Sequence, residues 1–423
     1  MLQSLVAAFR IPDLKKRITF LFMMFAVYVI GLHITVPGVN LQVLKGNFGG
    51  LLDIFNMFTG GAFKKFTIFG LGIMPYINAS IIMQLLTIAV PQLEELQKEG
   101  AAGQKKIKLW TRWLTVFLAF VQAIGMTRLM ESYGAIQIVS GWQTVHVVLT
   151  LVAGTAFLMW LGEQITEYGI GNGVSIVIFT GIVALLPRQI ADTAVVQWGN
   201  GNYGGIILLA MLFVGTISFM IAVTQAQRKI PIQHVKRVVG NKMYGGQSSF
   251  LPLKVNSAGV IPIIFAISIQ LFPATIVNMF THGARTGFWP NFASFISPGG
   301  SWFGSLSYAV MIIGFTYFYT AVTFNVKDVS DNLKKWGSFI PGIRPGKPTQ
   351  DYLDKVMTRI TLAGAVFLAI IALLQYYVPR FTGITQFQLV GGTSLLIVVG
   401  VALETMQAIE SHLLMRHYEG FIK

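Results

Sequence analysis

The chain has 423 residues, of which 54% are hydrophobic and only 11% are charged, whereas an ordinary soluble domain carries about 25% charged residues. It contains no cysteine, which excludes disulfides, thiol catalysis and thiolate metal sites. The net charge of +15 fits either nucleic-acid binding or orientation in a membrane, and the low charge content indicates a polytopic membrane protein.

The N-terminal segment, residues 1–18, is amphipathic and ends in a basic cluster. No small-residue cleavage pattern follows the first apolar run, so this run is expected to remain as a membrane span. A bilayer core of about 30 Å requires roughly 20 apolar residues per helix. This criterion predicts ten transmembrane helices, near residues 19–38, 69–90, 110–130, 147–166, 171–190, 205–224, 257–280, 303–325, 358–378 and 387–407.

A shorter apolar segment, GLLDIFNMFTGGAFKKF at residues 50–66, lies between the first two predicted spans and is interrupted by Gly60 and Gly61. It is too short to cross a bilayer. We expect it either to lie in the headgroups as a surface helix or to re-enter the protein, because non-helical backbone at membrane depth needs a cover of protein or water. The segment by itself favours neither alternative.

The second predicted span contains the stretch MPYINASIIMQLL, in which Asn78, Ser80 and Gln84 interrupt an apolar run. Ile77 and Ile81 are four residues apart and therefore fall on one face of a helix. This spacing alone is more typical of a lipid-facing or core stripe than of a functional site.

Ten spans place both termini on the same side of the membrane. Of the 31 Lys and Arg residues, 24 lie on that side and 7 on the other, so the positive-inside rule predicts cytoplasmic termini. Two loops on this side, residues 225–256 and 326–357, are longer than a helix connection requires, and such loops are usually functional. Their clustered cations suit an RNA backbone or an acidic protein surface.

Five spans in each half make the second half begin on the opposite side from the first. If the two halves are structural repeats, they are inverted, and such repeats commonly place a pathway at their interface. The span count therefore predicts an N-terminal half of residues 1–192 and a C-terminal half of residues 193–423.

Ionisable residues are nearly absent from the centres of the predicted spans. Glu163 and Glu404 lie near the cytoplasmic ends, where snorkelling or loop solvation explains them, and His33 and His146 are isolated. The sequence shows no HExxH motif and no nucleophile constellation. We therefore expect no enzyme activity, no metal site and no cofactor. The alternative function is a polytopic secondary transporter of small solutes, which should carry midplane charges.

Six stretches together closely resemble the SecY family, the bacterial protein-conducting channel. They occur in the family's order between residues 72 and 399, and read GIMPYINASIIMQLL, FLMWLGEQITEYGIGNG, LPLKVNSAGVIPIIFA, DNLKKWGSFIPGIRPG, DKVMTRITLAG and GGTSLLIVV. The resemblance implies an all-α polytopic membrane protein, in which ten transmembrane helices form two inverted five-helix halves around an hourglass channel. It also implies that residues 50–66 contain a short re-entrant plug helix.

The resemblance further implies a ring of six aliphatic residues that closes the channel waist. Matching the motifs residue by residue places this ring at Ile77, Ile81, Ile178, Ile182, Ile264 and Ile397. A lateral gate for membrane helices is implied near Asn78, Ser80, Gln84 and Gln270. The plug is implied at Leu51, Ile54, Phe55, Met57 and Phe58.

The two long loops match the family's docking sites for the SecA motor ATPase and the ribosome. The docking residues implied are Arg344, Lys229, Lys236, Arg237 and Lys242. Relatives often have two adjacent basic residues where this chain has Asn241 and Lys242.

The implied partners are SecE and SecG, the SecA motor, the ribosome, nascent chains that carry signal sequences, and the lipid bilayer. The implied function is the central channel subunit of the Sec translocase, which conducts unfolded secretory proteins across the cytoplasmic (inner) membrane and releases membrane-protein helices laterally.

Overall fold

The computed structural model describes residues 9, 11–40, 56, 59–132, 134–136, 141–234, 237–239, 242–244, 248–280, 287–384 and 392–419. In these residues the first half of the chain forms the helices α2 (Pro12–Gly31), α4 (Met74–Ala89), α5 (Pro91–Lys98), α6 (Ala101–Ser132), α7 (Gly141–Tyr168) and α8 (Gly173–Gly199). The second half forms α9 (Tyr203–Gln225), α10 (Ile261–Phe280), α11 (Phe288–Ile296), α12 (Trp302–Thr323), α13 (Val326–Lys335), α14 (Lys347–Thr382) and α15 (Thr393–Glu419).

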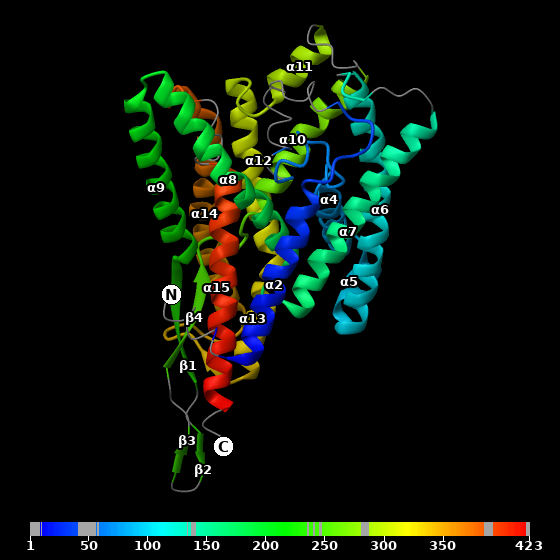
Figure 1. Ribbon diagram of the computed structural model, residues 1–423. Coiled ribbons are helices and arrows are strands. Elements are labelled where there is room, and N and C mark those ends of the chain that lie inside the picture. The colour runs from blue at the N-terminus through cyan, green and yellow to red at the C-terminus, as the bar shows by residue number, and fades with distance from the viewer. Residues whose placement is uncertain are drawn as a thin grey trace.

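The long helices run side by side along one direction (Figure 1). Each of the ten predicted spans coincides with a helix, namely α2, α4, α6, α7, α8, α9, α10, α12, α14 and α15. By length and composition, seven helices among the described residues are able to cross a membrane, or eight if α4 and α5 count as one broken span. The predicted all-helical, polytopic class is confirmed.

Several predicted boundaries were wrong. The first span was expected at residues 19–38, but α2 begins at Pro12, because proline and then Asp13 favour the first turn of a helix. α2 ends at Gly31, where the chain enters turns and short bridges before Pro37. The fifth helix was expected to end near residue 190, but α8 continues through Pro187 to Gly199, so the predicted boundary between the halves at residue 192 falls inside it.

The second span was expected to begin at residue 69, but α4 begins at Met74 because residues 59–73 form turns. At its other end, Val90 precedes Pro91, and a residue before proline avoids helical geometry. Val90 has an extended backbone, and α4 and α5 are bent by 100° at this point.

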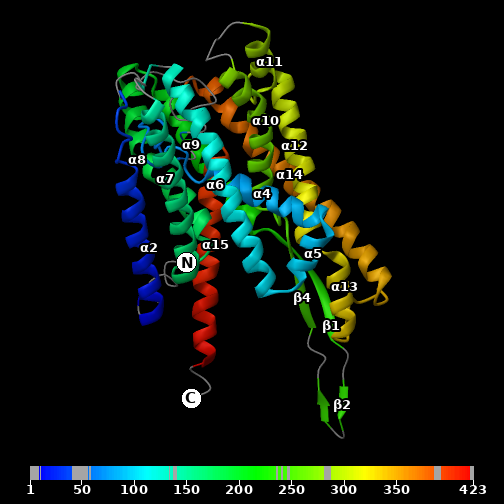
Figure 2. The same ribbon diagram turned by 90° about the vertical axis from the view of Figure 1, so that its right-hand side faces the viewer.

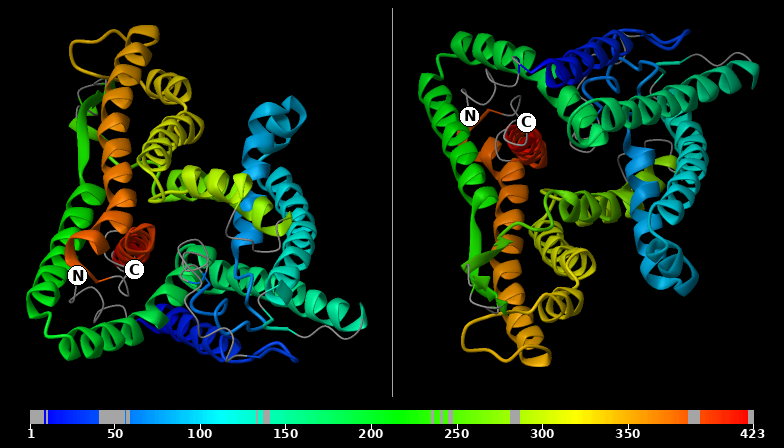
Figure 3. Two further views of the ribbon diagram at one scale, coloured as in Figure 1. Left: turned by 90° about the horizontal axis from the view of Figure 1, so that it is seen from above. Right: turned by 90° about the horizontal axis from the view of Figure 1, so that it is seen from below.

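The same pairs of helices pack together in both halves. In the first half α2 contacts α7 and α8, α4 contacts α6 and α7, and α7 contacts α6 and α8. In the second half α9 contacts α14 and α15, α10 contacts α12 and α14, and α14 contacts α12 and α15. When the helices of each half are taken in chain order, these two sets of pairs correspond one to one. In the view from above, α6 lies on one side and α9 and α14 lie on the other (Figure 3).

Both long loops contain strands, which the sequence analysis left undefined. β1 (Gln227–His234) pairs antiparallel with β4 (Ser248–Lys254) and with β5 (Ser338–Phe339), which gives the strand order β4-β1-β5. β2 (Arg237–Val239) and β3 (Lys242–Tyr244) pair as the tip of the hairpin, which projects from the helices at the same end as the C-terminal end of α15 (Figure 1).

The base of this hairpin has its own hydrophobic cluster. Ile230 and Ile232 on β1 are buried, and the residues between and beside them are exposed. They pack with Leu253, Leu333 and Met357. Successive strand residues face opposite sides of a sheet. Two isoleucines two positions apart are therefore the sequence signal of a half-buried strand. The two loops therefore form one unit (Figure 2).

Candidate functional site

A cavity of about 180 Å³ lies where helices of both halves meet. α4 contributes Ile77 and Ile81, α8 contributes Ile178, α10 contributes Ile264, and α15 contributes Ile397. Five of the six isoleucines predicted for the ring thus line one cavity, although they come from four helices. Ile77 and Ile81 share one face of α4, as their spacing predicts, and isoleucines of three other helices face the same cavity.

Ile182, the sixth predicted ring residue, does not line this cavity. It lies one turn further along α8 than Ile178 and is almost completely buried. All six isoleucines belong to the same hydrophobic cluster, in which Ile81 is partly buried and the others are buried.

Polar groups line another part of the same cavity. Ser80 and Gln84 of α4 face it, together with Asn172 and Ser175 at the start of α8. Asn172 caps α8, because its Oδ1 accepts hydrogen bonds from the backbone N–H groups of Val174 (3.1 Å) and Ser175 (3.4 Å). Of the residues predicted for the lateral gate, the structure therefore brings Ser80 and Gln84 to the isoleucine cavity.

The two other residues predicted for the gate do not line the cavity. Asn78 is half-buried on α4. Gln270 is buried on α10 and faces α11 and α12, because its Nε2 donates hydrogen bonds to the Ile296 carbonyl (2.6 Å), the Gly304 carbonyl (2.7 Å) and Ser307 Oγ (3.1 Å). Gln270 holds helices of the second half together.

Residues 59–73 fold into the protein as a series of turns. Gly60 (φ +65°) and Gly61 (φ +83°) have left-handed backbones, which favour glycine. A side chain on Gly60 would come within 2.7 Å of Gly181 Cα, next to Ile182 on α8. Phe69 stacks on Tyr28 of α2 at 5.8 Å between ring centroids. The described part of the predicted plug segment is thus covered by protein. The predicted plug residues themselves, Leu51, Ile54, Phe55, Met57 and Phe58, lie outside the described residues.

The predicted docking residues that the structure describes lie at the end that carries the hairpin. Lys229 on β1 is exposed, and so is Arg344 in the turn between β5 and α14, where the Arg344 carbonyl accepts a hydrogen bond from Thr349 Oγ1 (2.8 Å). The two loops are joined through Ser338 and His234, whose Oγ and Nδ1 are 2.8 Å apart. Arg237 and Lys242 lie on the paired strands of the tip, and Lys236 and Asn241 lie outside the described residues.

Glu163 was expected to be explained by snorkelling or loop solvation, but it has a specific partner in the structure. Arg112 of α6 donates from Nε and Nη2 to its two carboxylate oxygens, at 2.7 and 2.8 Å. Such a two-bond pair fixes the geometry of both side chains. The partners are 51 positions apart in sequence, so no local pattern indicates their contact. In the described part of the chain, no group of three or more His, Asp or Glu residues is arranged to hold a metal ion.

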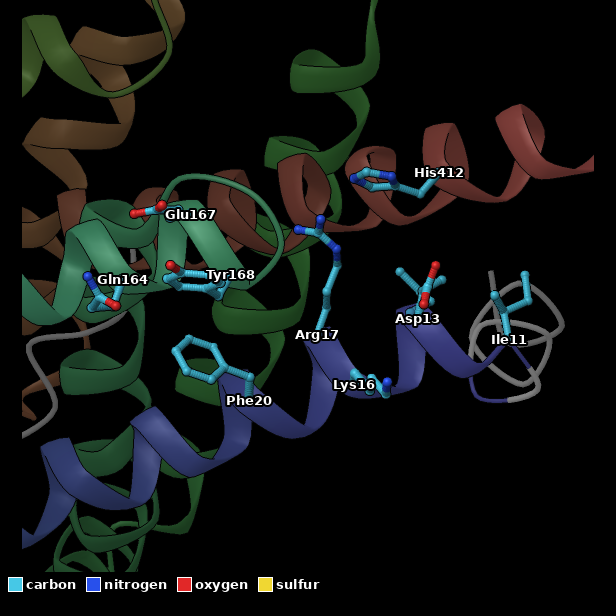
Figure 4. A pocket seen from close by; sticks show the side chains of 10 residues that line it. Ile11, Asp13, Lys16, Arg17, Phe20, Gln164, Glu167, Tyr168 and His412 are labelled. Atoms are coloured by element: carbon cyan, nitrogen blue, oxygen red, sulfur yellow. The ribbon is translucent and has the colours of Figure 1, made fainter. Parts of the chain in front are cut away.

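A second cavity, of about 790 Å³, opens between α2, α7 and α15 (Figure 4). Arg17 crosses it and donates to the Gly169 carbonyl at 3.0 Å, and Phe20 meets Tyr168 edge to face. Its charged lining residues are of both signs, and it shares no lining residue with the isoleucine cavity. This cavity was not predicted, because its lining comes from three helices that are far apart in sequence.

Comparisons with known proteins agree with one another. A sequence model of the SecY family matches residues 67–406. The chain is 46% identical over 437 aligned positions to the protein translocase subunit SecY of Halalkalibacterium halodurans, with 100% of both chains covered. Its fold is similar to that in "The structure of a protein conducting channel", with a TM-score of 0.64, 18% identity, and 94% and 92% of the two chains covered. It is also similar to canine Sec61 in a ribosome-channel complex, with a TM-score of 0.61, 16% identity and the same coverage.

Proposed function

Because the chain belongs to the SecY family and is a protein translocation channel subunit with several membrane spans, we propose that unfolded polypeptides cross it at the six isoleucines. One observation carries the proposal: isoleucines from α4, α8, α10 and α15, two helices of each half, meet at one cavity. Family membership also favours this function over the alternative of a secondary transporter.

The chemistry of the ring suits a passive pore. Branched apolar side chains offer no hydrogen bonds, so they close around a moving chain without binding a particular sequence, and an apolar constriction excludes water when it is empty. The ring therefore seals the channel and still accepts many substrates.

The lateral gate is proposed at the polar side of the cavity, on Ser80 and Gln84, with Asn78 beside them on α4. The supporting observation is that Ser80 and Gln84 line a cavity that α4 shares with α8 and α10. A seam that opens for a signal helix benefits from small polar contacts, because these separate more readily than interlocked apolar side chains. Gln270 of α10 is retained as a gate residue only in an indirect role, through its bonds to α11 and α12.

Residues 50–66 are proposed to form the plug. The support comes from Gly60 and Gly61, which pack on α8 next to Ile182. A plug hinged at this glycine pair would cover the ring from the end opposite the hairpin.

The halves are proposed to be inverted repeats. The one-to-one correspondence of their packed helix pairs supports this, as does the odd number of predicted spans in each half. The boundary between them is proposed at the turn after α8, near residues 200–202, because residue 192 lies within that helix.

The hairpin unit is proposed to dock the SecA motor and the ribosome, through Arg344, Lys229, Lys236, Arg237 and Lys242. Its projection beyond the helices and its exposed cations support this role. SecE and SecG are proposed as companion subunits. The work of moving a polypeptide then comes from SecA with ATP, from the translating ribosome or from the proton-motive force, and the channel itself is no enzyme.

The chain is proposed to lie in the cytoplasmic (inner) membrane with both termini in the cytoplasm. The support is the bias of Lys and Arg toward the side that carries the hairpin.

Cross-linking tests the path directly, because the chain has no cysteine and single-cysteine variants need no background substitutions. Ile77→Cys and Ile397→Cys, in the assembled translocase, should each form a disulfide with a cysteine in a precursor that is stalled during export. Both side chains are buried, so each cysteine should be reached by the precursor only if the precursor passes between these helices.

Ile82→Cys is the matched control, since Ile82 lies on the same helix but is exposed on another face. If Ile82→Cys cross-links to the stalled precursor as well as Ile77→Cys does, the proposed path is wrong.

A further inference from the structure

α11 is a short amphipathic helix whose aromatic residues gather on one face. Its sequence is FWPNFASFI. At about 100° per residue, Phe288, Trp289, Phe292, Phe295 and Ile296 fall within an arc of about 120°. The remaining residues of the helix are Pro, Asn, Ala and Ser. The helix carries no charged side chain.

This aromatic face is exposed. The exposed fractions are 76% for Phe288, 61% for Trp289, 44% for Phe292 and 50% for Phe295. Phe288 stacks on Phe292 with 6.3 Å between ring centroids, so the rings pack on one another. Contiguous apolar surface of this kind on a protein marks contact with another protein or with a membrane.

The aromatic face continues onto the helices that span the membrane. Phe295 stacks on Phe303 at 5.2 Å between ring centroids. Phe303 and its neighbour Trp302 begin α12, and Trp302 is 75% exposed. α12 is among the helices long and apolar enough to cross a bilayer, so its start marks the boundary between lipid and water. Trp and other aromatic residues concentrate at that boundary.

A cation lies at the same boundary. Arg380, near the end of α14, donates from Nη2 to the Gly299 carbonyl at 2.8 Å and lies over the ring of Tyr377. Its side chain is exposed, and the next residue, Phe381, is 77% exposed. A cation beside exposed aromatic rings is complementary to a lipid surface, where phosphate lies next to acyl chains.

The position of α11 is fixed by its neighbours. Gln270 of α10 donates to the carbonyl of Ile296, the last residue of α11, and also to the carbonyl of Gly304 on α12. Ser301 Oγ donates to the Phe295 carbonyl. α11 is therefore tied to α10 and α12 and cannot change its depth independently of them.

We propose that α11 is an interfacial anchor whose aromatic face inserts into the headgroup region of the bilayer, on the side opposite the hairpin. The partner is the lipid surface itself, because the face is aromatic, uncharged and continuous with the exposed start of α12, a helix long and apolar enough to cross a bilayer. Through Gln270, this anchor sets the depth of α10 in the membrane.

Nitroxide labelling tests the anchor. The Phe292→Cys and Asn291→Cys variants of the full chain, each labelled with a nitroxide, are reconstituted with the companion subunits in phosphatidylethanolamine and phosphatidylglycerol vesicles. Collisions with oxygen, which concentrates in lipid, are compared with collisions with a water-soluble nickel chelate. At position 292 the ratio of oxygen to nickel collisions should be several-fold higher than at position 291, and the label should lie about 5–10 Å within the interface.

Asn291 is the control, because it is exposed and lies about 100° around the helix from Phe292. Equal ratios at both positions would mean that α11 lies in water and would overturn the proposal. Protection of position 292 from both reagents would mean that protein covers the face, which would also overturn it. If Phe292→Cys does not fold, Trp289→Cys on the same face replaces it in the same comparison.

Discussion

The connection between the first two spans packs among the helices, whereas the corresponding connection in the second half projects away from them. Residues 59–73, before α4, fold into the protein against α2 and α8. Before α10, the strands β1 to β4 form a hairpin that projects from the helices (Figure 2). The helix packing is the same in both halves, so the halves share a frame and differ in their connections.

The difference follows from composition. The inner connection, residues 59–73, contains Gly60 and Gly61, which permit close approach to α8. It also contains apolar residues that are buried. In β1 of the second connection, two buried isoleucines alternate with the exposed residues Lys229, Pro231 and Gln233, which suits a strand with one face in water. The two compositions suit the roles proposed above, in which the first connection seals the channel and the second meets soluble partners.

Replacement of Gly60 by alanine is expected to have the largest effect on the inner connection. The new Cβ would lie 2.7 Å from Gly181 Cα and 3.1 Å from the Tyr28 hydroxyl, in a left-handed backbone. Overpacking costs about 1–3 kcal/mol, and the left-handed conformation costs about 1–2 kcal/mol more. The midpoint of thermal unfolding in detergent should fall, and ion leak through reconstituted vesicles should rise.

Gly38→Ala separates the two contributions. Gly38 also has a left-handed backbone (φ +84°), but an alanine Cβ at this position would have no atom within 4 Å. The variant should therefore show only the conformational cost and no added leak. Equal effects of both variants would mean that close packing of Gly60 on α8 is not what holds the inner connection.

Ile397→Asn is expected to have the next largest effect, on the seal between the two halves. Ile397 is 2% exposed, and an amide without a partner there costs about 1–3 kcal/mol. The closed channel bears this cost more than an open, hydrated channel does. Because 1.4 kcal/mol is about tenfold in an equilibrium, a precursor with a defective signal sequence should be exported more readily than in the unmodified channel.

The control for this variant is Ile370→Asn on α14, where the side chain is 48% exposed. It should alter insertion or stability without relaxing selectivity for signal sequences. Export is compared at matched channel abundance, and equal export by Ile397→Asn and the unmodified channel would remove Ile397 from the ring.

The sequence predicted the long helices better than the contacts between them. Apolar length predicted all ten long helices, and the spacing of Ile77 and Ile81 predicted a shared face. Ile264 and Ile397 come from helices far apart in sequence, so only the family resemblance placed them in the same ring. The partners of Gln270, and the pairing of Arg112 with Glu163, depend on packing between helices, which periodicity within one segment does not report.

The hairpin was missed for a different reason. Its signal was present, since Ile230 and Ile232 are two residues apart and are flanked by Lys229 and Gln233, but the run is short, contains Pro231 and lies in a loop dense with cations. Charge was therefore the dominant pattern there. The boundary errors at α2 and α4 have local causes, at Pro12 and in the turns of residues 59–73.

Arg344→Ala should have the smallest effect on the fold and should act only on the proposed docking role of the hairpin unit, to which its loop belongs through β5. Arg344 is exposed, and substitutions at such positions usually change stability by less than about 0.5 kcal/mol. Its backbone carbonyl, which accepts the bond from Thr349, is kept in alanine. The unfolding midpoint should stay unchanged, while SecA-driven export of a secretory precursor should slow more than insertion of a membrane protein does.

Lys347→Ala, at a nearby exposed cation that begins α14, controls for loss of charge alone. If Arg344→Ala exports the precursor at the unmodified rate, or if Lys347→Ala slows it equally, Arg344 has no specific docking role. A selective loss would show that Arg344 serves a soluble partner without stabilising the helices, whereas Gly60 is expected to stabilise the packing of residues 59–73 on α8.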